Sequence, residues 1–145
     1  MLKVVVVLAV VAVLAGLGTN WLRDRGKDLA HHAIDLSLPG TVEGPAWSPV
    51  SHGHAVRADR VRFADGHVTT VRCHLTLGTY SVRVDHGFTF SPQPGAIRRG
   101  CPGRSLRASL EHATRIDAEP SGRVIRLTFS DRDGATVATL RGRSG

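Results

Sequence analysis

The 145-residue sequence has few aromatic residues, only two cysteines and none of the short motifs that commonly mark an enzyme. Aromatic side chains make up 5% of the chain, so we expect a core of valine, leucine and isoleucine. The cysteines do not form a Cys-x-x-Cys pair, which argues against a redox centre. There is no Gly-x-Ser-x-Gly elbow and no glycine-rich phosphate loop, and the neighbours Cys73 and His74 should face opposite sides of a strand. We therefore predict no catalytic residues, no cofactor and no enzymatic activity.

The length and charge of the chain limit its organisation and its partners. A chain of this length supports a single domain, and its 41% hydrophobic and 21% charged residues are typical of a folded protein. The formal net charge of +7 favours polyanions such as lipid head groups, anionic wall polymers or nucleic acid. The arginines are spread along the chain rather than clustered, which argues against a nucleic-acid-binding tail. A biased use of arginine for exposed charges would produce the same distribution.

The N-terminal segment, residues 1–22, has the pattern of an export signal. Residues 4–18 carry no polar side chain, and extension to Leu22 brings the helix close to the ~30 Å thickness of a hydrocarbon core. Trp21 and Arg23 would then lie at the interface and among the head groups. We predict an uncleaved membrane anchor, with a cleaved signal peptide as the alternative. Leu17 occupies the position of a lipoprotein cysteine, so lipid attachment there is excluded.

Residues 23–51 contain several prolines and glycines and are predicted to form a tether. Within it, Ile34, Leu36 and Leu38 alternate with polar residues, a pattern that predicts the first strand of the sheet. We expect Trp47 at the edge of the core.

Residues 52–145 are predicted to form the folded domain. Alternating apolar residues predict strands, and Asp65-Gly66 and Asp85-His86-Gly87 predict hairpin turns between them. Gly78 indicates a bulge or a close backbone approach. We expect a helix at 105–114, ended by Pro120-Ser121-Gly122, and a last hairpin at 125–129 and 136–140. The predicted fold class is α+β: a mainly antiparallel, half-barrel-like meander with one short packed helix, preceded by the N-terminal helix.

The two cysteines, Cys73 and Cys101, bear on the location of the domain. Behind an export-type N-terminus, a cysteine pair is expected to form a disulfide. The alternative is a pair of reduced core cysteines in a domain that faces the cytoplasm. The charges flanking the N-terminal segment do not decide its orientation. We therefore rely on the cysteines, which predict a cell-membrane protein with its domain on the extracytoplasmic side, or a secreted domain if the signal is cleaved.

Two constellations suggest binding sites. Arg60 and Arg62 should share the outer face of one strand, where they could bind a polyanion or remain solvated. His52 and His54 could contribute to a metal site, together with His31, His32, His67 or His74. Two histidines at i and i+2 fall short of the three or four converging ligands that zinc or copper requires, so we predict no metal site.

The order of these features resembles the META domain family, which includes heat-inducible HslJ-type bacterial envelope proteins. The resemblance spans about residues 56–140. It is carried by Val61-Arg62-Phe63-Ala64-Asp65-Gly66-His67-Val68, Gly78-Thr79-Tyr80-Ser81-Val82, Phe88-Thr89-Phe90, Ile97-Arg98-Arg99-Gly100-Cys101-Pro102 and Leu127-Thr128-Phe129-Ser130-Asp131. It implies an antiparallel β-rich domain with one packed helix outside the cytoplasm, no catalytic residues, and a link to envelope stress.

Together these patterns predict a non-enzymatic, membrane-tethered envelope protein that supports envelope integrity or stress tolerance. It would bind another envelope component, either a protein or an anionic wall polymer. The alternatives are a secreted inhibitor of a cell-wall hydrolase and a histidine-based metal-binding protein.

Overall fold

The computed structural model describes residues 38–95 and 97–143. The predicted anchor and most of the predicted tether, including Ile34 and Leu36, lie outside these residues. Among the helices of the described part, none has the length and apolar character needed to cross a membrane.

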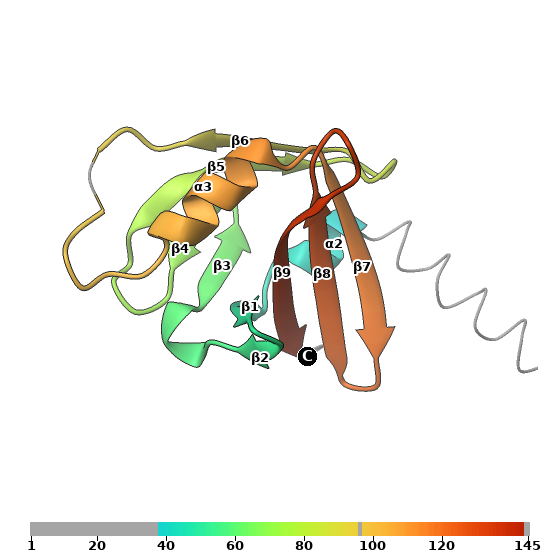
Figure 1. Cartoon of the computed structure of the whole chain (residues 1–145), viewed down its shortest axis with the longest axis horizontal. Coiled ribbons are helices and arrows are strands. Elements are labelled where there is room, and N and C mark those ends of the chain that lie inside the picture. Colours follow the sequence, from blue (N-terminus) through green and yellow to red (C-terminus); the bar gives the residue numbers. More distant parts are fainter. Residues whose placement is uncertain (1–37, 96, 144–145) are drawn as a thin grey trace, which may run out of the picture. The chain divides into compact units, whose positions relative to one another are not determined.

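The domain is an antiparallel β-sheet curved into a half-barrel (Figure 1). Two meanders form it, each from strands joined by short turns. The first contains β3 (Val61–Ala64), β4 (His67–Thr70), β5 (Thr76–Val82) and β6 (Phe88–Pro92), and the second contains β7 (Arg115–Ser121), β8 (Val124–Ser130) and β9 (Thr136–Arg143). With β1 (Ala46–Ser51) between the two meanders, the strand order is β6-β5-β4-β3-β1-β9-β8-β7. This confirms the prediction of a mainly antiparallel half-barrel.

Strand β1 (Ala46–Ser51) joins the two meanders, because it pairs with β3 through Ala46 and Trp47 and with β9 through Ser48 and Pro49. A short strand, β2 (His54–Ala55), also pairs with the end of β1, and the 3-10 turn η1 (Arg57–Asp59) leads from β2 to β3.

The folded domain begins earlier than the boundary at residue 52 that the sequence suggested. Leu38 does not lie in a strand but begins the helix α2 (Leu38–Val42), whose Leu38 and Val42 are buried. Trp47 lies in the core rather than at its edge, since it has no exposed surface and its Nε1 donates a hydrogen bond to the Val42 carbonyl at 2.8 Å. The described part of the predicted tether is thus packed against the sheet.

The core is mostly aliphatic, as expected, with a group of aromatic rings at its centre. The Phe129 ring of β8 stacks on Phe63 of β3 at 6.2 Å and meets Phe88 of β6 edge-on at 4.9 Å. Phe129 therefore links the second meander to the first. The fully buried aliphatic residues around these rings include Val61, Val68, Leu77, Leu110, Ile116, Leu127 and Leu140.

Helix α3 (Arg104–His112) lies across the half-barrel and buries Leu106 and Leu110 against it. It ends at His112, and β7 follows at once, so the structure forms a strand over residues 115–121 where the sequence predicted the end of a helix. A disulfide between Cys73 and Cys101 joins the turn after β4 to the segment that precedes α3, with Cα atoms 5.9 Å apart. Cys73 and His74 lie in this turn rather than in a strand.

Gly78 confirms the expected close approach. A Cβ atom there would meet the Ser91 carbonyl oxygen and lie 2.6 Å from Phe90 Cζ, and the β4–β5 register shifts beside it. The atoms that approach Gly78 belong to β6, which pairs with β5 in the same sheet.

Candidate anion-binding site

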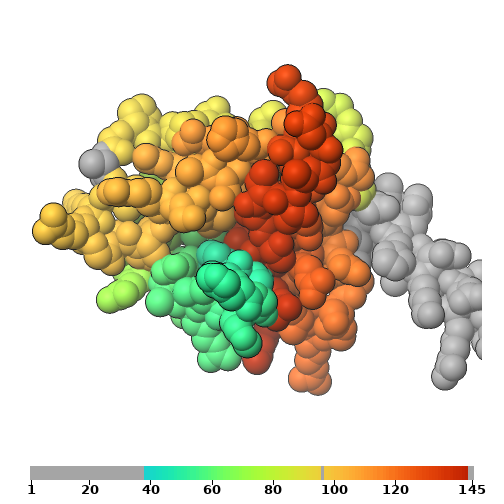
Figure 2. Space-filling view, in the orientation of Figure 1, coloured from blue at the N-terminus to red at the C-terminus, as the bar shows by residue number. Residues whose placement is uncertain are grey.

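A pocket of about 610 Å³ lies on the outer side of the sheet where β1, β9, β2 and η1 meet. Four of its lining residues are arginines: Arg57, Arg60, Arg141 and Arg143. In Figure 2 the green surface of β2 and η1 lies beside the dark red of β9. The remaining lining residues are small or apolar, so the guanidinium groups supply all the charge of the lining.

The alternation of β9 places two of these arginines on the outer face. Leu140 and Gly142 point inward and are buried, while Arg141 and Arg143 point outward. Gly142 is required by Trp47, because a Cβ at this position would lie 2.7 Å from the indole Cε3. The close packing of β9 on the tryptophan thus fixes the strand whose outer side carries Arg141 and Arg143.

The other two arginines come from the chain around η1. Backbone hydrogen bonds hold this chain: Val56 N donates to the Pro49 carbonyl at 2.7 Å, and Val71 N donates to the Arg60 carbonyl at 2.9 Å. Arg57 and Arg60 are therefore presented by ordered backbone at both ends of the turn.

The pocket gathers four arginines and no carboxylate. Elsewhere some arginines are paired with carboxylates: Arg126 Nη1 lies 3.8 Å from Glu119, and Arg83 pairs with Asp85. No aspartate or glutamate lines the pocket, and within residues 38–95 and 97–143 none of its four guanidinium groups has a side-chain hydrogen bond or ion pair. Four unneutralised cations around one concavity attract anions.

The predicted polyanion face contained Arg60 and Arg62, both of which are exposed, and one of the two lines the pocket. Arg60 lines the pocket, whereas the exposed Arg62 lies on β3 opposite Ala46, which is itself a lining residue. Sequence reasoning missed Arg57, Arg141 and Arg143. The alternation of β9 was a signal that Arg141 faces outward, but only the pairing of Ser48 with Arg141 brings it to the η1 region.

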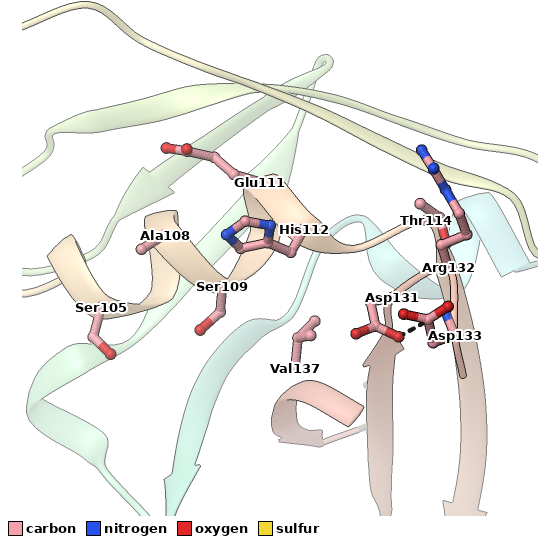
Figure 3. A pocket seen from close by; sticks show the side chains of 10 residues that line it. All are labelled: Ser105, Ala108, Ser109, Glu111, His112, Thr114, Asp131, Arg132, Asp133 and Val137. Atoms are coloured by element: carbon pink, nitrogen blue, oxygen red, sulfur yellow. Dashed lines mark hydrogen bonds between the residues drawn. The ribbon is translucent and has the colours of Figure 1, made fainter. Parts of the chain in front are cut away.

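A second, shallower pocket of about 770 Å³ lies between α3 and the turn after β8 (Figure 3). Ser109 and His112 of α3 face this pocket, with Asp131 on its far side. The Asp131 Oδ1 atom accepts hydrogen bonds from the backbone N–H groups of Asp133 and Ala135, both at 2.9 Å, and so stabilises the turn. In the described part of the chain no hydrogen bond joins Ser109, His112 and Asp131.

The histidines do not gather into a metal site among the described residues, where no group of three or more potential ligands occurs. His52 Nδ1 lies 3.0 Å from Ser51 Oγ, and His67 Nδ1 lies 2.9 Å from the Asp65 carbonyl. His31 and His32 lie outside the described residues.

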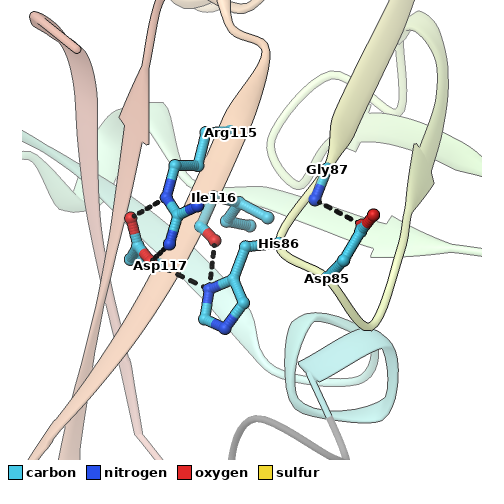
Figure 4. A network of polar contacts seen from close by, with 6 residues as sticks. All are labelled: Asp85, His86, Gly87, Arg115, Ile116 and Asp117. Atoms are coloured by element: carbon cyan, nitrogen blue, oxygen red, sulfur yellow. Dashed lines mark hydrogen bonds and ion pairs between the residues drawn. The ribbon is translucent and has the colours of Figure 1, made fainter.

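A polar network joins the free edges of the two meanders (Figure 4). His86 Nδ1 lies 2.8 Å from Asp117 Oδ1 and 3.1 Å from the Ile116 carbonyl; both are acceptors, so this nitrogen carries the proton. Ile116 N donates in return to the His86 carbonyl at 2.9 Å. In the same turn, the hydrogen bond from Gly87 N lowers the pKa of Asp85 below its usual range. These contacts close one end of the half-barrel.

Tyr80 is the single tyrosine of the chain, and its hydroxyl donates to Glu43 Oε1 at 3.0 Å. Partial burial raises the pKa of Tyr80 well above its usual range, and the hydrogen bond to Glu43 raises it further. The phenol thus remains neutral and connects β5 to the residue after α2.

Comparison of the chain with protein-family models, with curated protein sequences and with solved structures gives no match in any of the three.

Proposed function

We propose that this chain is a non-enzymatic, membrane-tethered envelope protein whose β domain binds an anionic envelope component at the four-arginine pocket. The observation that carries the proposal is the presence of four arginines without carboxylate partners around one pocket. The net charge of +7 adds a long-range attraction for the same class of ligand.

This proposal has three further parts. The domain lies outside the cytoplasm, residues 1–22 tether it to the membrane, and it resembles the META domain family. The Cys73–Cys101 disulfide supports the placement, because such bridges persist in oxidising compartments. An anionic wall polymer is the ligand that the pocket suits best, since a polymer presents repeated charges to several arginines at once.

The test is cosedimentation of the full chain, held in a neutral detergent, with bacterial cell walls that retain their anionic polymers. The variant Arg141→Ala/Arg143→Ala should weaken binding about tenfold or more, because charge-assisted hydrogen bonds are among the strongest in proteins. The matched control, Arg98→Ala/Arg99→Ala, removes the same charge from an exposed loop that does not line the pocket and should bind nearly as wild type does.

Equal weakening by the two double variants would show that net charge, rather than the pocket, governs binding and would refute the proposal. Circular dichroism of each variant separates a binding defect from loss of fold. Pull-down with wall hydrolases tests the alternative function: inhibition of a captured hydrolase by the wild-type chain would favour the inhibitor.

A further inference from the structure

The chemical class of the anion can be inferred from the arrangement of the four arginines, on the premise that the proposed anion-binding function is right. We propose that the pocket binds a base-free phosphodiester polymer with short alkyl repeats, and that successive phosphates are held by Arg141 and Arg143.

The spacing of two arginines along β9 matches the repeat of such a polymer. Arg141 and Arg143 are two residues apart on one face of a strand, so their Cα atoms are separated by about 7 Å. Two residues of extended backbone and one three-carbon phosphodiester repeat each contain about six main-chain bonds, so an extended polymer advances by the same distance per phosphate. Such a polymer can therefore lie along β9 with one phosphate at each arginine.

The four arginines approach the pocket from two different elements. Arg141 and Arg143 reach the pocket from β9, whereas Arg57 and Arg60 reach it from the chain around η1. A phosphodiester has two free oxygens on a tetrahedral centre and can accept hydrogen bonds from both elements. A carboxylate also has two acceptor oxygens, but their lone pairs lie in the plane of the group, so it suits donors from two different directions less well than a tetrahedral phosphate does. Arginines on two elements thus favour phosphate over carboxylate.

The apolar lining residues of the pocket fit the uncharged part of the ligand. The lining also contains Pro45, Ala55 and Val124, and Val124 is one of the few large apolar side chains left exposed in the described residues, at 37%. These residues suit the carbon atoms of an alkyl repeat. The lining contains no aromatic residue, and stacking on aromatic rings is how proteins commonly hold the bases of single-stranded nucleic acid. The pocket therefore fits a phosphodiester chain without bases.

The test measures binding of the full chain in neutral detergent to three probes of matched charge: poly(glycerol phosphate), poly-L-glutamate and oligothymidylate. Poly(glycerol phosphate) should bind about tenfold or more tightly than either of the others. The salt dependence is the slope of the logarithm of the binding constant against the logarithm of the salt concentration. Arg141→Ala/Arg143→Ala should reduce the magnitude of this slope by about 0.7 per lost phosphate contact, whereas Arg98→Ala/Arg99→Ala should leave it unchanged.

A length series tests the spacing. Glycerol phosphate oligomers with two phosphates should bind about tenfold more tightly than the monomer, because the second arginine is then engaged intramolecularly. The variant Arg143→Ala should remove this gain.

The outcomes distinguish this inference from the function on which it rests. If poly-L-glutamate binds as tightly as poly(glycerol phosphate) and also depends on Arg141 and Arg143, the phosphodiester assignment fails while the anion-binding function stands. Equal or tighter binding of oligothymidylate overturns the base-free assignment, and an equal affinity for one and two phosphates overturns the spacing. If none of the probes binds through these arginines, both proposals fail.

Discussion

Removal of the Cys73–Cys101 disulfide should destabilise the domain by an amount that follows from the length of the loop it closes. The two residues are 28 positions apart, and closing a loop of this size lowers the entropy of the unfolded chain by the equivalent of about 3–4 kcal/mol. Total stabilities of domains lie near 5–15 kcal/mol, so the bridge contributes a large share. The double variant Cys73→Ser/Cys101→Ser should therefore melt about 15 °C or more below wild type.

Urea denaturation followed by circular dichroism measures this difference in the free energy of unfolding. The control is reductant: it should destabilise the wild type by the same amount and leave the double variant unchanged. A variant within about 1 kcal/mol of the oxidised wild type would refute the entropic argument. Alkylation of both cysteines in native, unreduced protein would refute the bridge itself.

Two further predictions concern packing and pH. Gly142→Ala should lower the free energy of unfolding by about 1–3 kcal/mol in denaturation experiments, because its Cβ would collide with Trp47. The control Gly40→Ala should be neutral or stabilising, because no atom lies within 4 Å of a Cβ built at Gly40. Equal effects of the two variants would contradict this. Because the pKa of Tyr80 is raised in the folded protein, the contribution of its neutral phenol to the free energy of unfolding is complete below about pH 10. This contribution declines as the pH rises above that value. Ultraviolet titration of this single tyrosine should give a lower pKa in Glu43→Gln that still exceeds the usual value, and an unchanged pKa would refute the role of Glu43.

The parts of the fold that the sequence predicted are those with clean alternation and glycine turns. Val61 and Phe63 marked β3, and Asp65-Gly66 marked the turn after it, since positive φ angles at both residues suit a tight hairpin. Strands β1 and β7 were missed because each contains a proline, and the two-residue strand β2 was also missed. In β7, Pro120 is tolerated because this strand lies at the end of the sheet. In β1, Pro49 is the last residue that pairs with β9, and the next residue, Val50, pairs with β2.

The candidate site was harder to predict than the fold, because no local signal places three of its arginines at the pocket. Arg60 belongs to a short alternating run and could be selected from sequence. Arg57 lies in an irregular turn, and Arg141 reaches the pocket only through the register of β9 on β1. Long-range pairing of this kind cannot be read from periodicity, which reports only which face a residue occupies.

The central position of β1 has a consequence for the order in which the protein acquires its structure. Among the described residues, the strand that joins the two meanders is the first, and its partner β9 is the last. During synthesis the first meander can fold early, but the side of β1 that pairs with β9 has no partner until residues 136–143 emerge. Such non-local pairing makes folding slow. The emergence of β9 should therefore be the event that completes the sheet, and loss of β9 would unseat Trp47 and the second meander together.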